Sequence, residues 1–307
     1  MDKYRKNSQE WIDLLKEKNL LIPNEERFKW YIDNYNFFNF VKRYSMPFYS
    51  NQDTKKSFYN KNSTSEMIID LFNLDRNLSS LILSDILSIE KKLSTLICKE
   101  IIDSNSEKIP NLKNIHFYDL EDEDFYIIFP RIKNAVPNRE DKIEYLKERL
   151  FKNGKNKNKE KYIWECFLEF DFGQICEIFS YIDTSSKRNI VSLFSGLEEK
   201  TNFYFEFQKM IELINYVRNM ICHNNPIYNI NYNQYNKAKK SIISLYKEIF
   251  FKEISEIKLF NIINMIVFIC PHTKTKLYDL TKSRFDDLFL KYKEDFIKNI
   301  KKIVNYE

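Results

Sequence analysis

The sequence predicts an all-α fold, and three observations support this prediction. Only 3 of the 307 residues are glycine and only 7 are proline, whereas β-rich and α/β folds depend on glycine for hairpins, bulges and phosphate loops. Long stretches carry apolar side chains at helical spacing, without the alternation typical of strands. Gly154, Gly173 and Gly196 are too far apart to form GxGxxG or GxxxxGK, which excludes a Rossmann fingerprint and a P-loop.

Helical periodicity predicts the elements in order along the chain. Helices are expected over residues 7–18 and 25–44, and Pro47 ends the second of them. The longest helix is expected from Glu66 to Glu100, after a capping-box pattern formed by Ser63 and Glu66. The remaining helices are expected over residues 141–152, 162–182, 187–194, 204–222, 233–252, 254–268 and 283–304.

Composition limits the classes of partner. The formal charge of +5 and the pI of about 8.6 permit an anionic partner but do not require one. The 20 Tyr and 26 Phe residues suit a surface that stacks bases, although AT-rich codon usage explains them equally simply.

Cysteine usage and hydropathy indicate the compartment. The 5 cysteines form no CxxC pair, which is typical of a reducing cytoplasm. Cys270 and His272 have no second pair beside them, so we expect neither a metal site nor a cofactor. The N-terminus has no apolar signal segment, and the longest apolar run, residues 262–270, is too short to span a membrane. We therefore expect a cytoplasmic protein with no membrane partner.

Two basic segments are candidates for phosphate contacts. The first is the low-complexity stretch of residues 152–161 and the second is the last helix. In both cases the alternative is a solvated surface with no partner. The candidate RNA-binding lysines are Lys152, Lys155, Lys157, Lys159, Lys161, Lys298, Lys301 and Lys302.

One of the three histidines lies in a segment that suits catalysis. His223 follows Arg218 with four residues between them, in VRNMICHNNPIYN. Because Pro226 disfavours helical backbone at Asn225, we expect the helix to end near His223. Taken alone, this spacing is equally compatible with a helix C-terminus that carries a capping histidine and a surface arginine.

A resemblance strengthens the catalytic interpretation. RNMICHNNPIYN resembles the RN-x-x-A-H-H-x-R-L-W/Y-N signature of the Abi_2 (AbiD/AbiF-like) abortive-infection family, which contains the Rx4–6H motif of HEPN ribonucleases. The matching positions are Arg218, Asn219, His223, Tyr228 and Asn229. Three more blocks resemble the family in its order, over residues 14–48, 71–97 and 164–182. The departures are Asn224 for the second His, Pro226 for an Arg and Asn39 for an earlier Arg.

The resemblance implies a fold and an activity. It implies an HEPN-like helical core over residues 61–252, with an N-terminal helical segment over 1–60 and C-terminal helices over 253–307 packed on that core. The activity would be metal-independent RNA cleavage, with Arg218 and His223 as catalytic residues, Asn219 orienting the phosphate and Asn224 binding RNA. DNA lacks the ribose 2′-hydroxyl that such chemistry uses, so it is not an expected substrate.

The same resemblance implies partners and leaves alternatives open. A homodimer is implied because HEPN sites usually combine two motifs, and control by a small structured non-coding RNA is implied by the AbiF type. One alternative is a catalytically silent protein that only holds a non-coding RNA. Another is a helical HEPN protein regulated by a protein antitoxin. Glu90, on the long helix, either points into the same groove or is a structural carboxylate.

Overall fold

The protein is all-α over the residues that the structure describes, as the sequence predicts. The computed structural model describes residues 7–50, 58–132, 142–151, 161–195, 203–230, 239–269, 276–292 and 294–306. More than half of the 307 residues lie in α-helices. Over the described ranges, β-pairing is limited to three isolated β-bridges.

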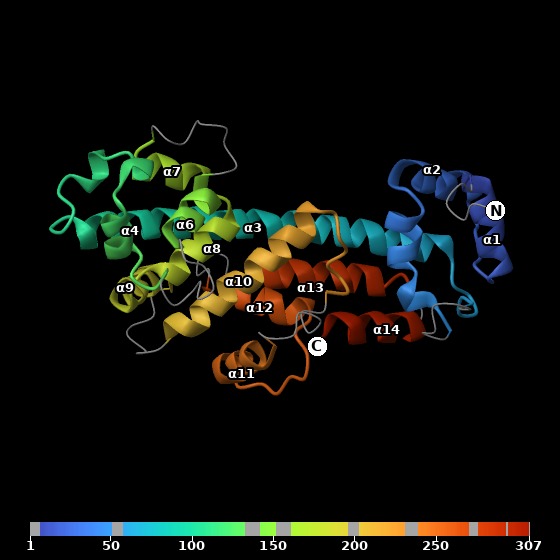
Figure 1. Ribbon diagram of the computed structural model, residues 1–307. Coiled ribbons are helices and arrows are strands. Elements are labelled where there is room, and N and C mark those ends of the chain that lie inside the picture. The colour runs from blue at the N-terminus through green and yellow to red at the C-terminus, as the bar shows by residue number, and fades with distance from the viewer. Residues whose placement is uncertain are drawn as a thin grey trace.

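A single long helix, α3 (Ser65–Asn105, 41 residues), forms the axis of the molecule (Figure 1). The apolar stripe predicted for it is buried, including Ile68, Ile82 and Ile97 at 0% exposure. The predicted capping box is wrong, because Thr64 is the N-cap and its side chain accepts from the Met67 N–H. Ser63 instead donates its hydroxyl to the Phe48 carbonyl. The long helix itself is confirmed.

The N-terminal segment covers the beginning of α3. It contains α1 (Ser8–Glu17), α2 (Glu25–Tyr35), a π-helical turn (Phe38–Lys42) and a 3-10 turn (Met46–Phe48). The prediction of one helix over residues 25–44 is wrong, since the chain breaks at Asn36, whose φ is 66°. The Asn36 side chain accepts from the Phe38 N–H at 2.9 Å and so starts the next turn.

Short helices surround the other end of α3, and one longer helix crosses it. The short helices are α4 (Asp122–Ile128), α6 (Lys142–Phe151), α7 (Ile163–Glu169), α8 (Phe172–Tyr181) and α9 (Thr184–Ser195), with 3-10 turns at Leu112–Asn114 and Phe117–Asp119. α10 (Phe203–Cys222) crosses α3 near its middle (Figure 1).

The prediction of one helix over residues 162–182 is wrong. A capping box of Asp171 and Gln174 starts α8 afresh after α7 has ended.

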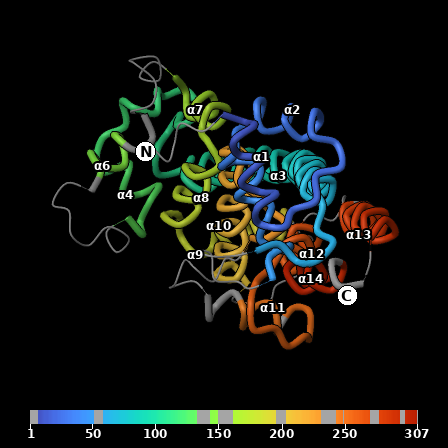
Figure 2. The backbone as a smooth tube through the Cα atoms, turned by 90° about the vertical axis from the view of Figure 1, so that its right-hand side faces the viewer, coloured from blue at the N-terminus to red at the C-terminus, as the bar shows by residue number. Residues whose placement is uncertain are grey.

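The C-terminal helices pack beside α3 and α10. They are α11 (Lys239–Phe250), α12 (Leu259–Ile269), α13 (Lys276–Phe289) and α14 (Glu294–Val304). α13 contacts α3 and α12, and α12 contacts α10, so this segment shares one continuous apolar core with the rest of the chain. Figure 2 shows α11 to α14, in orange and red, gathered on one side of the molecule.

The helix predicted over residues 283–304 is divided in two. The connection between α13 and α14 is held against α3, because Tyr292 donates to Asp70 at 2.6 Å and Lys291 pairs with the same carboxylate at 3.6 Å. Among the described residues, no helix is long and apolar enough to cross a membrane.

Candidate functional site

The end of α10 carries the Rx4H segment in a closed turn. The N–H of Asn224 donates to the Ile221 carbonyl at 3.0 Å and that of Asn225 to the Met220 carbonyl at 2.9 Å. This is the Schellman arrangement, with His223 at the C-cap and Asn224 in the left-handed region at φ 54°. Asparagine tolerates that conformation better than most residues. We call residues 219–225 the α10 turn.

Two arginines from distant segments hold the α10 turn in place. Arg43, after the π-helical turn, donates to the Asn224 carbonyl at 3.1 Å and to the Asn225 side chain at 2.9 Å. Arg76, on α3, donates to the Asn224 side chain. Asn224, predicted to bind RNA, therefore also fixes the turn to two cationic side chains.

A buried carboxylate anchors the chain that follows the turn. Asp75, on α3, is 1% exposed and accepts three hydrogen bonds. The donors are the Tyr44 hydroxyl at 2.7 Å and the backbone N–H groups of Ile227 at 3.0 Å and Tyr228 at 2.6 Å. Tyr44 and Tyr228 stack on each other with ring centroids 5.4 Å apart. The N-terminal segment, α3 and the Rx4H segment thus meet at Asp75.

Burial governs the proton affinity of this carboxyl group. It raises the pKa of Asp75 to about 6, against the opposing effects of its three hydrogen bonds and of Arg76. Proximity to the Asp75 charge and burial together also raise the pKa of Tyr44 and of Tyr228, with burial the larger cause in each case. Both phenols therefore remain protonated and can donate.

Arg218 forms a long ion pair with Glu90 that contains no hydrogen bond. Its Nε is 3.9 Å from Glu90 Oε2, and both atoms are buried without a hydrogen-bond partner. The Arg218 guanidinium reaches the Asn219 side chain only at a long 3.5 Å. A buried arginine donor without an acceptor is costly. The Arg218 side chain as a whole is 27% exposed, so the outer part of the guanidinium, and not the buried Nε, is what an anionic oxygen could reach.

The beginning of α8 completes the surroundings of Glu90. Burial raises the pKa of Glu90, Arg218 lowers it, the Asp171 carboxylate raises it further, and a hydrogen bond from the Phe172 N–H lowers it. Gly173, in the FG pair of the third block, lies close to α10, because a Cβ there would be 3.6 Å from Asn215 Nδ2. Glu90, which belongs to α3, therefore lies next to both α8 and α10, in the same region as Arg218.

The histidine side chain is exposed at the helix end. His223, Asn219 and Asn224 are all exposed, and Arg218 is partly buried. Within the described parts of the chain, no hydrogen bond or ion pair joins Arg218 to His223. Five positions along a helix separate two side chains by ~140°. The two side chains therefore leave the end of α10 in different directions, one suited to binding an anion and the other to moving a proton.

The candidate lysines are spread over the molecule. Lys152, Lys155, Lys157 and Lys159 lie outside the described residues. Lys161 pairs with Glu169. The other three lie on α14 as follows: Lys298 and Lys302 are exposed, and the ammonium group of Lys301 lies 5.2 Å from the rings of Phe289 and Tyr306.

Within the described residues, the remaining histidines and cysteines form no second site, and Cys270 lies outside those residues. His116 pairs with Asp119 at 3.3 Å, and His272 lies outside the described residues. Cys98, Cys166, Cys176 and Cys222 are free thiols. Over the described ranges, no group of three His, Cys, Asp or Glu side chains is placed to hold a metal ion.

Sequence reasoning did not assign roles to Arg43, Tyr44, Asp75 and Arg76. A signal for Asp75 is present, because it falls on the apolar stripe of α3 between buried Leu71 and buried Leu78. A charged residue on such a stripe indicates a buried polar contact. Arg43 carries no comparable local signal, since its partners are more than 180 positions away.

Comparison with known proteins identifies one family. The model of the family described as Abi-like protein, Abi_2, matches residues 30–229. This range covers about two-thirds of the chain and contains α3, α8, α10 and the α10 turn. No curated protein and no solved structure gives a significant match.

Proposed function

The chain belongs to the Abi-like protein family, and we propose that it acts in abortive infection as an RNA-binding, metal-independent endoribonuclease of the HEPN type. The observation that carries the proposal is the α10 turn. It presents His223 to solvent and lies beside Arg218, whose buried Nε has no acceptor. The cationic side chains of Arg43 and Arg76 bind the same turn.

The proposed reaction is transfer of a phosphodiester within RNA. The ribose 2′-oxygen attacks the adjacent phosphorus, the bond from phosphorus to the 5′-oxygen breaks, and a 2′,3′-cyclic phosphate and a 5′-hydroxyl are formed. His223 would move a proton at the attacking or the leaving oxygen. Arg218 would hold the additional negative charge of the pentacoordinate phosphate through its guanidinium donors. Asn219, exposed next to Arg218, would orient the phosphate.

Glu90 would set the position of Arg218 in this scheme. A carboxylate 3.9 Å from the Nε attracts the guanidinium without occupying its donor. The Arg218 side chain is thereby retained near α8 while its hydrogen-bonding capacity stays available for substrate. This arrangement favours a substrate-binding role for Arg218 over a purely structural ion pair.

The proposal includes a second copy of the chain and a regulatory RNA. Arg218 and His223 point from different sides of one helix end, so a second copy of the motif would complete a composite site in a homodimer. A small structured non-coding RNA would hold the protein inactive. The same separation of the two side chains also supports a second candidate, in which the site binds RNA without cutting it.

Two measurements on the same variants test the proposal. Expression of the protein should arrest growth, and His223→Ala and Arg218→Ala should remove this effect at equal protein level. RNA binding by the purified variants should persist, because affinity comes mainly from many phosphate contacts. Persistent toxicity of His223→Ala would remove this residue from the catalytic role. Loss of both toxicity and RNA binding would favour the non-cleaving candidate.

A further inference from the structure

A cavity lies between the N-terminal segment, the start of α3, and the connection from α13 to α14. Its volume is about 820 Å³, within the range of ~300–1,000 Å³ that is typical of small-molecule sites. Its walls come from the 3-10 turn at Met46–Phe48, residues 60–64, Met67 of α3, and the neighbouring parts of the α13–α14 connection and α14. Four separate segments of the chain therefore line it.

The charge of this cavity is positive. Lys61, Lys291 and Lys298 line it, and no carboxylate is among its lining residues. Lys61 and Lys298 are exposed, and neither has an acidic partner within the described part of the chain. Two lysines at a hollow whose lining contains no carboxylate favour an anion as its ligand.

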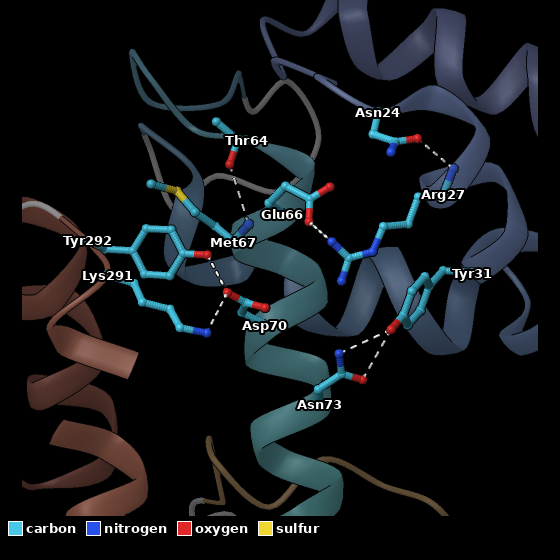
Figure 3. Close-up of polar contacts among 10 residues, drawn as sticks. All are labelled: Asn24, Arg27, Tyr31, Thr64, Glu66, Met67, Asp70, Asn73, Lys291 and Tyr292. Atoms are coloured by element: carbon cyan, nitrogen blue, oxygen red, sulfur yellow. Dashed lines mark hydrogen bonds and ion pairs between the residues drawn. The ribbon is translucent and has the colours of Figure 1, made fainter. Parts of the chain in front are cut away.

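The third lysine, Lys291, is fixed at the wall of the cavity by contacts with α3. Figure 3 shows Lys291 and Tyr292 pointing from the α13–α14 connection toward Asp70 on α3. Lys291 Nζ lies 3.6 Å from Asp70 Oδ2, and the Tyr292 hydroxyl donates to the same oxygen at 2.6 Å. These contacts attach the connection to α3 and place Lys291 at the wall. Because Asp70 is engaged by both groups, it neutralises Lys291 only, leaving Lys61 and Lys298 for a ligand.

The uncharged lining indicates more than a simple inorganic anion. Met67 and Tyr292, both partly exposed, supply apolar and aromatic surface, and Asn60 and Asn62 supply side-chain amides. Amides can pair with the edges of a base, and aromatic rings can contact its face. We propose that this cavity binds a nucleoside phosphate, supplied either as a free nucleotide or as the phosphorylated end of an RNA.

This site is separate from the α10 turn. Met67, at the cavity, and Arg76, which binds the turn, are nine positions apart on α3. That spacing places them on opposite sides of the helix and ~14 Å apart along its axis. The proposal therefore goes beyond the proposed RNA cleavage and does not depend on it.

Calorimetric titration with three probes tests the ligand class. AMP should bind saturably, whereas adenosine and inorganic phosphate should each bind much more weakly. Lys61→Glu and Lys298→Glu should each weaken AMP binding by about tenfold or more, because each removes a charge-assisted contact. The matched control is Lys99→Glu, which makes the same change at an exposed position of α3 outside the cavity, and it should change binding less than twofold.

A second arm distinguishes the two sources of the phosphate. A 5′-phosphorylated RNA decamer is compared with AMP and with the same decamer carrying a 5′-hydroxyl. Tighter binding of the phosphorylated decamer than of both others identifies an RNA end, and AMP binding at least as tight as the phosphorylated decamer identifies a free nucleotide. The proposal is overturned if neither phosphorylated probe binds saturably. Equal binding of AMP and adenosine, or equal losses in Lys99→Glu and Lys298→Glu, would also overturn it.

Discussion

The buried carboxylate of Asp75 should make stability depend on pH in a defined direction. Its folded-state pKa is raised to about 6 by burial, whereas an aspartate in an unfolded chain titrates near ~3.9. Between these values the folded state binds more protons than the unfolded state, so the free energy of unfolding falls as pH rises. The contribution is fully present below pH ~4 and is lost by pH ~6–7. A difference of about two pKa units corresponds to roughly 3 kcal/mol.

Two substitutions separate this charge from the hydrogen bonds. Asp75→Asn keeps the shape and an acceptor for the two N–H donors of Ile227 and Tyr228 but cannot ionise. Its stability relative to the natural protein should therefore improve by up to about 3 kcal/mol between pH 4 and pH 7. Asp75→Ala leaves three buried donors without an acceptor. It should cost about 3 kcal/mol or more, at roughly 1–3 kcal/mol for each of the three unsatisfied groups.

The assay is urea unfolding of the three proteins at pH 4, 5, 6 and 7. The comparison with Asp75→Asn cancels the titration of all other groups, including Glu90. A difference between the natural protein and Asp75→Asn that stays constant over this range would refute the reasoning, because it would mean that the carboxyl group has the same pKa in the folded and unfolded states.

Three further predictions concern the turn, the assembly and the lysines. Asn224→Ala should lower the free energy of unfolding in urea by about 1 kcal/mol more than Asn224→Gly does, because both variants lose the contact with Arg76 but only glycine adopts a φ of 54° readily. Equal effects would contradict the importance of the left-handed backbone at this position. The solution mass, measured by light scattering, should equal two chains if the site is composite, and a single-chain mass with and without RNA would count against this. Lys→Gln changes in residues 152–161 and in α14 should lower the salt slope of RNA binding by roughly one unit or less for each lost contact, and unchanged binding in filter assays would indicate solvated surfaces.

Helices with a continuous apolar stripe were predictable from the sequence, and their interruptions were not. The stripe of α3 continues without a glycine or proline, so its length follows from periodicity alone. At Asn36 and at Asp171 the apolar spacing also continues on both sides. There the helix is ended by side chains that hydrogen-bond nearby backbone groups. The break between α13 and α14 depends on Asp70, more than 200 residues earlier in the chain.

The candidate site was predictable only in part for the same reason. The positions of Arg218 and His223 follow from a local motif, and the end of the helix at His223 follows from Pro226. The anchoring of the turn by Asp75 and Arg43 joins residues more than 150 positions apart, and no periodicity encodes such a contact. The lack of a hydrogen-bond acceptor at the Arg218 Nε likewise depends on the packing of α3, α8 and α10.

The most direct test of the proposed activity is the chemical nature of the RNA ends. Purified protein, incubated with end-labelled RNA in the presence of EDTA, should produce fragments that end in a 2′,3′-cyclic phosphate. A 2′-deoxy substitution at the cleaved position should block the cut, and His223→Ala should reduce its rate by about 10²–10⁴ while RNA binding is retained. Cleavage at an unchanged rate by His223→Ala, or equal cleavage of the 2′-deoxy substrate, would contradict the assignment of the α10 turn as the active site.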